Sequence, residues 1–297
     1  MKKVLIYILI SAILFSTMEV TLKIAGLSLD AFQLTFIRFF VGGIFLLPFA
    51  MVEIKKRGTR FSMGDIGYMT LLGFICICVG MIFFQLGVMG ANASTAAVIF
   101  CTNPIFTMIF AHYVAEEKMT PTKAIAAAIS IAGLIAIINP LNMSPGNTLQ
   151  GMLFSLASAV TFGLYSAIGK RRIRKLGGLT QTSISFIIGA GILFLILLIL
   201  DKPVVRGIQA DNFAVVLYVS IAVTGLGYLY YFLAMELSNA TMASLVFFVK
   251  PGIAPVIAVI VLHEVITLNV LIGILLIFIG SYMTMNRATL VSSMHRD

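Results

Sequence analysis

The sequence predicts an all-α integral membrane protein, with ten transmembrane helices arranged as two inverted five-helix repeats and both chain ends in the cytoplasm. Three observations predict this fold: the apolar composition, a succession of long apolar runs, and a self-similarity at one fixed offset. Of the 297 residues, 60% are hydrophobic and only 10% are charged, and the mean hydropathy is +1.09. A water-soluble domain of this length needs more polar surface than this to cover itself.

Apolar runs of about 20 residues, each long enough to span a bilayer as a helix, fill most of the chain. Short loops rich in Asn, Asp, Gly, Ser and Pro separate them and hold most of the charge. The first run is too long for a signal peptide, so we interpret it as the first spanning helix. The runs cover roughly residues 4–25, 31–52, 65–88, 93–115, 122–139, 150–170, 180–200, 212–235, 240–262 and 267–286.

The basic residues indicate which way the helices face. With the first chain end placed in the cytoplasm, fifteen Lys and Arg residues lie in cytoplasmic loops or tails, and only Lys202 and Arg206 lie outside. Because basic loops stay on the cytoplasmic side, we expect a multi-pass protein of the inner (plasma) membrane. The net charge of +9 is therefore a topology signal, and no nucleic-acid partner is predicted.

A shift of 147 residues aligns the chain with itself without a gap. We therefore divide it into a first repeat at 1–145 and a second at 146–297. Each repeat has five helices, an odd number, so the second must enter the membrane inverted. Inverted repeats are typical of transporters, whose halves rock about a central site. The aligned identities include Phe15 with Phe162, Lys23 with Lys170, Pro104 with Pro251, and Gly133 with Gly280.

Several motifs recur at fixed places in the predicted helices. The fourth predicted helix of each half contains a proline, and a Glu followed by a Thr comes just after it, in Glu117–Thr120 and Glu264–Thr267. The second helix carries an Arg-Phe segment, Thr35–Phe40. This layout resembles the drug/metabolite transporter superfamily, and within it the EamA-type family, and the resemblance covers the whole chain. It implies transport of amino acids, nucleosides, amines or other small metabolites across the inner membrane, often outward.

Ionisable side chains within spanning segments cost roughly 2.5–3.5 kcal/mol each on insertion scales, so each is a candidate functional residue. Glu19 and Arg38 are predicted to share a level in the outer third of the membrane. Two interpretations of Glu19 are open: an ion pair with Lys23 or Arg38, or a carboxylate that binds a cationic substrate group or exchanges a proton. Arg38 is interpreted as an architectural ion-pair residue, and Lys23 as a residue that snorkels to the outer interface.

Lys250 is predicted near the bilayer midplane, roughly 15 Å into its helix. Its repeat partner is Asn103, so both halves place a polar residue directly before a proline. Each proline leaves the carbonyl four residues earlier without a donor, and that carbonyl must be buried in protein or face a wet cavity. Both polar residues are predicted to contact substrate, and Lys250 has the alternative of an ion pair with Glu19. The predicted hinge residues are Pro104, Pro251, Gly252 and Pro255.

Aromatic residues are dense around these positions and are predicted to line the same cavity. A tyrosine hydroxyl at membrane depth favours an interior face, where a polar partner is available. The predicted aromatic substrate contacts are Phe15, Tyr165, Tyr228, Tyr231 and Phe247.

The predicted function is secondary active transport of a small polar or amphipathic metabolite, such as an amino acid, nucleoside, amine or drug-like compound, with export as the favoured direction and alternating access around a midplane cavity. A channel or facilitator is the first alternative, and an intramembrane enzyme the second. All aspartates fall in loops or tails, and the stretch His263–Thr267 lacks the second His of a zinc motif. No catalytic residue, metal or cofactor is therefore predicted. The predicted partners are the substrate, the bilayer and a coupling proton or other ion, with the chain as a monomer or homodimer.

Overall fold

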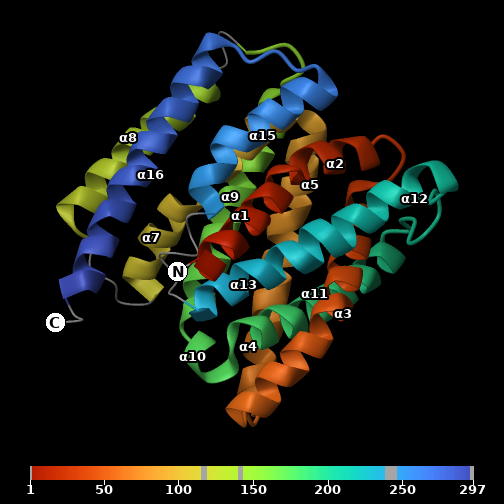
Figure 1. Ribbon diagram of the computed structural model, residues 1–297. Helices are drawn as coiled ribbons and strands as arrows, with labels where there is room; N and C mark the ends of the chain where they lie inside the picture. Colours follow the sequence, from red (N-terminus) through yellow and green to blue (C-terminus); the bar gives the residue numbers. More distant parts are fainter. Residues whose placement is uncertain (1, 115–118, 140–142, 238–245, 295–297) are drawn as a thin grey trace.

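The computed structural model describes residues 2–114, 119–139, 143–237 and 246–294, and over these residues the chain is helical with no strand (Figure 1). Its elements are α1 (Lys2–Ser16), α2 (Met18–Ala25), α3 (Ala31–Arg57), α4 (Met63–Gly73), η1 (Phe74–Met81), α5 (Ile82–Gly90), α6 (Ala93–Phe100), α7 (Asn103–Val114), α8 (Pro121–Ile137), α9 (Leu149–Lys170), α10 (Ile173–Leu176), α11 (Gly178–Ile199), α12 (Ala210–Leu217), η2 (Tyr218–Leu226), α13 (Gly227–Leu237), α15 (Val246–Leu262) and α16 (Leu268–Met294).

Seven helical stretches of the described chain are long and apolar enough to cross a membrane. This supports the predicted all-helical membrane protein, whereas the count of ten spans and the side of the chain ends stay predictions. Three shorter apolar helices, Pro121–Ile137, Val249–Leu262 and Leu268–Gly280, occupy the remaining predicted spans. The seven long stretches are Lys2–Ala25, Ala31–Arg57, Met63–Gly90, Ala93–Val114, Leu149–Lys170, Gly178–Ile199 and Ala210–Met235.

Capping residues explain where several helices begin and end. The Asp30 side chain accepts a hydrogen bond from the Phe32 amide and starts α3, and Gly58 ends α3 with φ of 61°, a conformation that favours glycine. Ser62 and Asp65 form a capping box at the start of α4. These polar and glycine residues therefore turn the chain between successive apolar helices.

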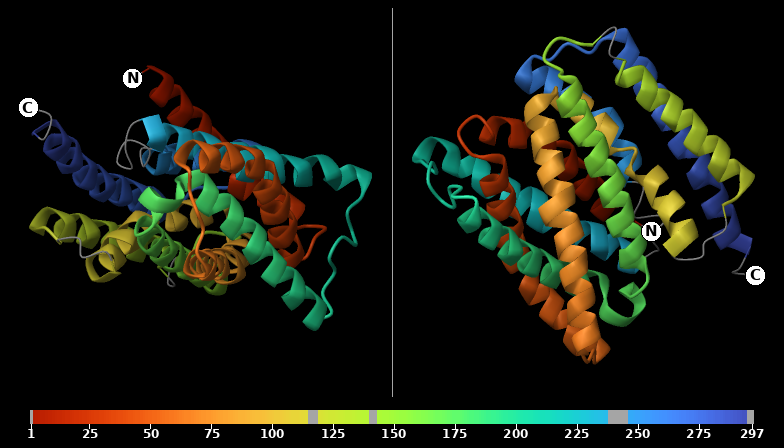
Figure 2. Two further views of the ribbon diagram at one scale, coloured as in Figure 1. Left: turned by 90° about the horizontal axis from the view of Figure 1, so that it is seen from below. Right: turned by 180° about the vertical axis from the view of Figure 1, so that it is seen from behind.

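The helices run between two ends of the bundle, which are distinguished by their loops (Figures 1 and 2). The distal end carries the loops at 26–30, 91–92, 200–209 and 263–267. The proximal end carries the loop at 58–62 and the short helix α10. Helices α8 and α16 lie side by side at the edge of the bundle.

Glycines allow two pairs of helices to approach closely. A Cβ on Gly73 would lie 2.3 Å from the Ser185 carbonyl oxygen, and one on Gly189 would lie 2.6 Å from the Gly73 carbonyl oxygen, so α4 and α11 pack backbone to backbone. A Cβ on Gly42 would lie 3.2 Å from the Ser220 carbonyl oxygen, where α3 meets η2. Gly42 aligns with Gly189, and Gly73 with Ser220, under the 147-residue shift. The same small-residue packing thus recurs at the repeat distance.

Two segments depart from the α-helical geometry that the sequence predicts. The π-helical segments η1 and η2 interrupt the third and the eighth apolar runs. In η2, Thr224 Oγ1 donates a hydrogen bond to the Val219 carbonyl five residues earlier. Apolar periodicity does not report such turns, which are frequent at functional sites. Met81, the last residue of η1, contacts the buried Arg38, so this departure borders the candidate site.

Candidate substrate-binding site

A buried ion pair joins two helices inside the bundle. Lys250 Nζ of α15 lies 2.6 Å from Glu19 Oε1 of α2, and each of the two side chains is only 1% exposed. Desolvating two charges costs several kcal/mol for each ion, so such a pair persists only where the contact is close. The structure thus brings together the predicted midplane lysine and the predicted membrane carboxylate.

A helix break next to Glu19 helps to position it. Between α1 and α2, Ser16 Oγ donates to the Ala12 carbonyl at 2.6 Å, and Thr17 Oγ1 donates to the Leu14 carbonyl at 2.8 Å. Hydroxyl side chains that bond to the preceding turn bend helices. The chain therefore starts a new helix at Met18, and Glu19 lies in the first turn of that helix.

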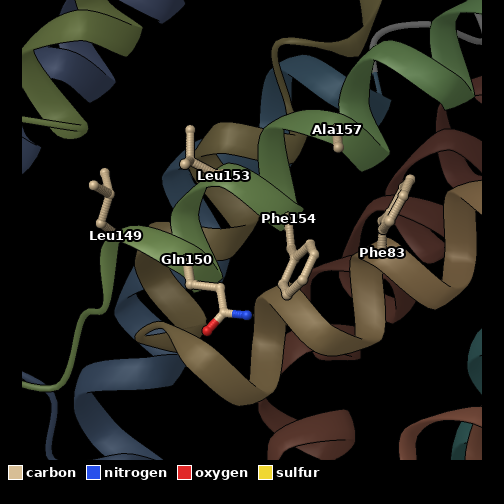
Figure 3. A pocket seen from close by; sticks show the side chains of 6 residues that line it. All are labelled: Phe83, Leu149, Gln150, Leu153, Phe154 and Ala157. Atoms are coloured by element: carbon tan, nitrogen blue, oxygen red, sulfur yellow. The ribbon is translucent and has the colours of Figure 1, made fainter.

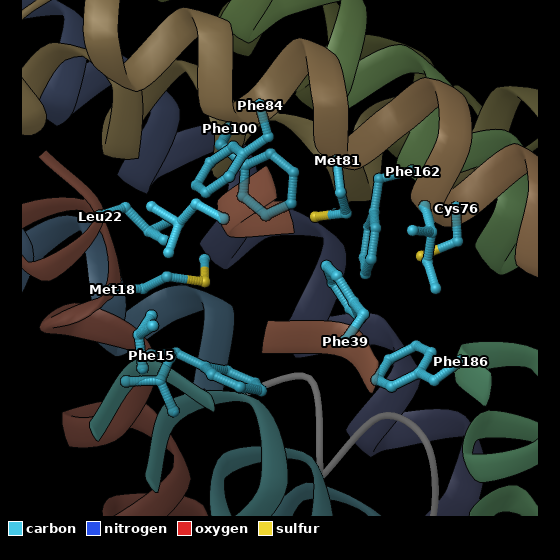
Figure 4. Packing of buried hydrophobic residues seen from close by; sticks show 14 of the residues in the cluster. Phe15, Met18, Leu22, Phe39, Cys76, Met81, Phe84, Phe100, Phe162 and Phe186 are labelled. Atoms are coloured by element: carbon cyan, nitrogen blue, oxygen red, sulfur yellow. The ribbon is translucent and has the colours of Figure 1, made fainter. Parts of the chain in front are cut away.

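Aromatic rings enclose the ammonium group of Lys250. Its Nζ lies 5.2 Å from the centroid of Phe100 and 5.9 Å from that of Phe84, distances at which a ring face attracts a cation. The centroids of the two rings are 4.6 Å apart. Figure 4 shows them next to each other, above Leu22 and Met18. The cation therefore has one carboxylate and two ring faces as its surroundings.

Arg38 of α3 is a second buried cation, 1% exposed. Its Nη1 lies 3.8 Å from the Met18 sulfur, its Nη2 lies 3.3 Å from the Met81 sulfur, and its Cζ lies 4.3 Å from the centroid of Phe39. Its Nε has no hydrogen-bond acceptor in the part of the chain that the structure describes. The sequence predicts an ion-pair role for Arg38. In the structure, the residue at ion-pair distance from Glu19 is Lys250. The Arg38 guanidinium contacts the sulfur atoms of Met18 and Met81 and the ring of Phe39.

Lys23 is separate from the buried pair. Its Nζ donates a hydrogen bond to the Ala91 carbonyl at the distal end, and Ala91 is the cap residue that follows α5. The last carbonyls of a helix lack donors within the helix and favour a cation. Of the three partners that the sequence left open for Glu19, the structure places Lys250 at ion-pair distance, whereas Lys23 bonds the carbonyl at the end of a helix.

The aromatic residues predicted to line a cavity are brought together as a packed group of rings, and Phe15 contacts three of them. Phe162 joins the remaining one to the rings around Lys250. Substrate contact by these rings stays a prediction. The centroid distances are 5.0 Å for Phe15–Tyr228, 6.5 Å for Phe15–Tyr231, 6.5 Å for Phe15–Phe247, 5.4 Å for Phe162–Tyr165 and 5.3 Å for Phe100–Phe162.

The two proline-containing helices differ from each other. In the first half, α6 ends at Phe100 and α7 begins at Asn103, whose Nδ2 donates at 2.8 Å to the Phe100 carbonyl. This side chain replaces the backbone donor that Pro104 lacks. In the second half, α15 continues from Val246 to Leu262 through Pro251 and its second proline. The sequence predicts matching hinges at Pro104 and Pro251. Over the described residues, the first half has a break between α6 and α7, whereas α15 of the second half is one continuous helix.

Glu264 connects the two halves at the distal end. Its Oε1 accepts from the Ala93 amide at 2.6 Å, and its Oε2 accepts from the Ser94 amide at 3.0 Å and the Ser94 hydroxyl at 2.6 Å. The carboxylate thus caps α6, whose N-terminus favours an anion. The repeat partner of Glu264, Glu117, lies outside the described residues.

Sequence reasoning missed the polar contacts at the proximal end. Asp65 is completely buried and lies 2.8 Å from Arg172 Nη1 and 2.5 Å from Lys175 Nζ. Glu53 Oε2 accepts from the Thr180 amide at 2.8 Å, at the start of α11. These partners are more than one hundred residues apart along the chain, and the basic run containing two of them was interpreted only as a topology signal.

Two grooves on the outside of the bundle lie away from the ion pair. A groove of about 510 Å³ lies between α8 and α9. No ionisable side chain lines either groove, so the buried charges inside the bundle are the better candidate site. The other groove, of about 600 Å³ (Figure 3), is lined by Phe83, Leu149, Gln150, Leu153, Phe154 and Ala157.

Comparison with known proteins decides the family. The profile of the EamA-like transporter family matches residues 2–139 and again 149–286. The chain belongs to the EamA-like transporter family. An uncharacterized transporter of Clostridium kluyveri is 38% identical to this EamA chain over 287 residues, which cover 95% of the chain and 92% of the relative.

This EamA chain is also similar to a second named transporter and to a solved structure. An S-adenosylmethionine uptake transporter of Rickettsia prowazekii is 26% identical over 186 residues, 62% of this chain and 60% of the relative. A solved crystal structure has a TM-score of 0.65 at 17% identity, covering 98% of this chain and 99% of that one, and shows a shared fold. The predicted EamA resemblance is confirmed, and the chain is a multi-pass membrane transporter.

Proposed function

We propose that the protein is a secondary active transporter that moves a small polar or amphipathic metabolite by alternating access around Glu19, Lys250 and Arg38. The observation that carries the proposal is the Glu19–Lys250 pair, buried at 2.6 Å among helices apolar enough to cross a membrane. An ion pair at that depth is costly. A substrate that offers a positive group to Glu19 and an acceptor to Lys250 can therefore separate the pair without leaving either charge bare.

The proposed topology has ten spans in two inverted repeats, with both chain ends in the cytoplasm and the distal end outside the cell. The asymmetry of Lys and Arg supports the orientation. The two matches to the family profile and the recurrence of glycine packing at a 147-residue interval support the repeats. The proposed location is the inner (plasma) membrane.

Transport then follows from movement of the two halves. Substrate enters from the proximal end and exchanges contacts with Glu19 and Lys250. The break between α6 and α7 and the prolines Pro251 and Pro255 of α15 act as hinges, because a missing backbone hydrogen bond makes a helix easier to bend. Release to the outside requires Glu264 to leave the N-terminus of α6. A proton that binds Glu19 is the proposed coupling ion.

The candidate substrates are amino acids, nucleosides, amines and drug-like compounds. S-adenosylmethionine belongs on this list because relatives from Rickettsia are named as its uptake transporters. Export is the proposed direction for this chain, and uptake is the direction that those relatives' names give. A transport assay that varies the side of the gradient separates the two directions.

A channel or facilitator is the second candidate function. The burial of the central charges favours alternating access over an open channel, because each of Glu19, Lys250 and Arg38 is at most 1% exposed in the part of the chain that the structure describes. An intramembrane enzyme has less support: among the described residues no group of three His, Cys, Asp or Glu side chains is placed to hold a metal.

Counterflow in liposomes tests the proposed function. Purified protein is first screened by thermal shift against amino acids, nucleosides, amines, organic anions and S-adenosylmethionine. Each solute that stabilises the protein is then loaded unlabelled into proteoliposomes, and uptake of the labelled solute is followed. A transporter gives saturable uptake that the internal solute accelerates, whereas flux that is linear in concentration and indifferent to internal solute would contradict alternating access.

A further inference from the structure

The proximal end of the bundle carries a large surplus of positive charge. Residues 53–65 and 170–177 meet there and contain nine Lys and Arg residues but only two acidic residues, a net charge of +7. At the distal end, residues 200–211 contain two residues of each sign. The topology rule for Lys and Arg accounts for a surplus at one end of a membrane protein. It leaves open which of these cations have a carboxylate partner.

Both acidic residues of this end are already bound. The Asp65 side chain, 0% exposed, lies 2.8 Å from Arg172 Nη1 and 2.5 Å from Lys175 Nζ, so it fastens the chain around α10 to the start of α4. Figure 1 shows α10 and α4 at this end of the bundle. Glu53 Oε2 accepts hydrogen bonds from the Thr180 amide and hydroxyl, each at 2.8 Å. The two carboxylates therefore hold helices together.

The basic run 170–175 thus contains cations of two kinds. Arg172 and Lys175 bind Asp65, whereas Arg171 and Arg174, which alternate with them, are exposed and form no ion pair with the described residues. The end of α3 and the loop after it contain further exposed cations of the second kind. Together these residues form the proximal basic surface, which consists of Lys55, Lys56, Arg60, Arg171 and Arg174.

This surface lies at the depth of lipid headgroups. Helix α3 has 27 residues, about 40 Å at 1.5 Å per residue, whereas the hydrocarbon core of a bilayer is about 30 Å thick. The last turn of α3, with Lys55 and Lys56, therefore extends into the headgroup layer. Just beyond it, Phe61 is 37% and Met63 is 82% exposed. Exposed apolar side chains beside cations favour the boundary between headgroups and acyl chains.

We propose that the proximal basic surface binds the headgroups of anionic phospholipids in the adjacent leaflet, with Phe61 and Met63 inserted among the acyl chains. The planar guanidinium of Arg171 or Arg174 matches two phosphate oxygens, and lysine supplies a point charge to the same group. A zwitterionic phospholipid brings its own ammonium group, whereas the phosphate of an anionic phospholipid has no internal counter-charge. The surplus at this end therefore selects the anionic lipid. The inference does not depend on the proposed transport function.

Lipid binding to the full-length wild-type protein in detergent gives the first test. Anisotropy of a phosphatidylglycerol labelled on its acyl chain reports binding, and unlabelled phosphatidylglycerol, phosphatidylcholine with the same chains, and glycerol 3-phosphate compete with it. Phosphatidylglycerol is expected to bind about tenfold or more tightly than phosphatidylcholine, and added salt is expected to reduce that preference. Glycerol 3-phosphate, which has no acyl chain to accompany the insertion of Phe61 and Met63, is expected not to compete.

Substitutions within one basic run give the second test. Arg171→Gln combined with Arg174→Gln is expected to lower the affinity for phosphatidylglycerol about tenfold, since each basic residue near an anionic surface strengthens binding about fivefold. Both side chains are exposed, so the unfolding temperature without added lipid should stay the same. The matched control is Lys202→Gln combined with Arg206→Gln, which removes two cations from the distal end. Its preference for phosphatidylglycerol is expected to equal that of the wild type.

Three results would overturn the inference. One is phosphatidylcholine that binds the wild type as tightly as phosphatidylglycerol. Another is an unchanged preference in the Arg171 and Arg174 double variant, or an equal loss in the distal control. The third is displacement of the labelled lipid by glycerol 3-phosphate as effectively as by the lipid, which would indicate a site for a free phosphate instead of a lipid surface.

Discussion

At the scale of single residues, the Glu19–Lys250 pair combines a short contact with nearly complete burial. Replacing a buried ion pair by apolar or neutral groups is often tolerated, but removing one partner leaves a bare charge. The pair is thus more sensitive to single than to double substitution, and this asymmetry distinguishes it from a surface contact such as Lys202–Asp30.

Lys250→Met is expected to lower the free energy of unfolding by about 3–5 kcal/mol, because Glu19 is left buried and unpaired. The double variant Glu19→Gln with Lys250→Met is expected to recover most of that loss. Thermal or denaturant unfolding in detergent measures both. Lys202→Met, from a half-exposed pair, should change stability by no more than about 1 kcal/mol. A double variant as unstable as Lys250→Met would show that the two residues are not coupled.

Glu19→Gln is expected to abolish the pH dependence of transport. If a proton on Glu19 releases Lys250, efflux from loaded proteoliposomes rises when the outer solution is acidified relative to the lumen. The amide cannot take up that proton, so efflux by the variant stays flat across the same gradient. Fluxes at matched and opposed pH gradients provide the measurement. A wild type that is already indifferent to pH excludes proton coupling through Glu19.

At the scale of the elements, close packing depends on a few small residues at particular faces. Gly189 of α11 meets the backbone of Gly73, whereas Gly191, two residues further along the same helix, has nothing within 4 Å of the position a Cβ would take. Sequence patterns indicate that glycines are frequent in such helices, but they do not say which glycine faces a neighbour. The two positions therefore form an internal pair for comparison.

Gly189→Ala is expected to destabilise the protein by about 1–3 kcal/mol, because its Cβ would lie 2.6 Å from the Gly73 carbonyl oxygen and the helices would have to separate. Gly191→Ala should be neutral or stabilising by up to about 1 kcal/mol, since alanine is the better helix former. Thermal unfolding of the two variants in the same detergent provides the measurement. Equal stabilities would argue against this α4–α11 contact.

The cap of Glu264 on α6 gives a second expectation at this scale. Glu264→Ala removes the acceptor of two amide hydrogen bonds and one hydroxyl hydrogen bond at the distal end. With the native cysteines replaced and a cysteine placed at the buried Ala96, an impermeant maleimide is expected to react about tenfold faster in this variant. Asp30→Asn, at the same end, is the control. An unchanged labelling rate would mean that Glu264 does not hold the distal end closed.

At the scale of the whole molecule, the sequence predicted what depends on hydrophobicity and repetition. Over the residues that the structure describes, the apolar runs are helical near their expected bounds, and the 147-residue offset relates Gly42 to Gly189 in equivalent packing. Glu19 meets its partner only because α2 and α15 approach each other in the folded chain. Sequence reasoning therefore left Lys23, Arg38 and Lys250 as alternative partners of Glu19. The π-helical segments could not be predicted either, because hydrophobic periodicity does not distinguish them from α-helix. The Glu264 cap could not be predicted because periodicity does not encode hydrogen bonds between distant segments.

In the part of the chain that the structure describes, the centre of this transporter holds the cations Arg38 and Lys250 and the carboxylate Glu19, each at most 1% exposed. The central claim is that Lys250, paired with Glu19, is where substrate exchanges contacts. It is separable from folding, because size-exclusion chromatography and thermal unfolding report the fold independently of transport. A variant that stays monodisperse therefore isolates the role of the lysine in transport from its role in stability.

Counterflow by Lys250→Ala tests that claim most directly. With the best solute from the screen loaded inside the vesicles, wild-type protein and the Lys202→Gln control are expected to give saturable, internally accelerated uptake. The Lys250→Ala variant, reconstituted as a folded and monodisperse protein, is expected to give no uptake above empty liposomes. Uptake by that variant at the wild-type rate and affinity would contradict a role for Lys250 at the site of transport.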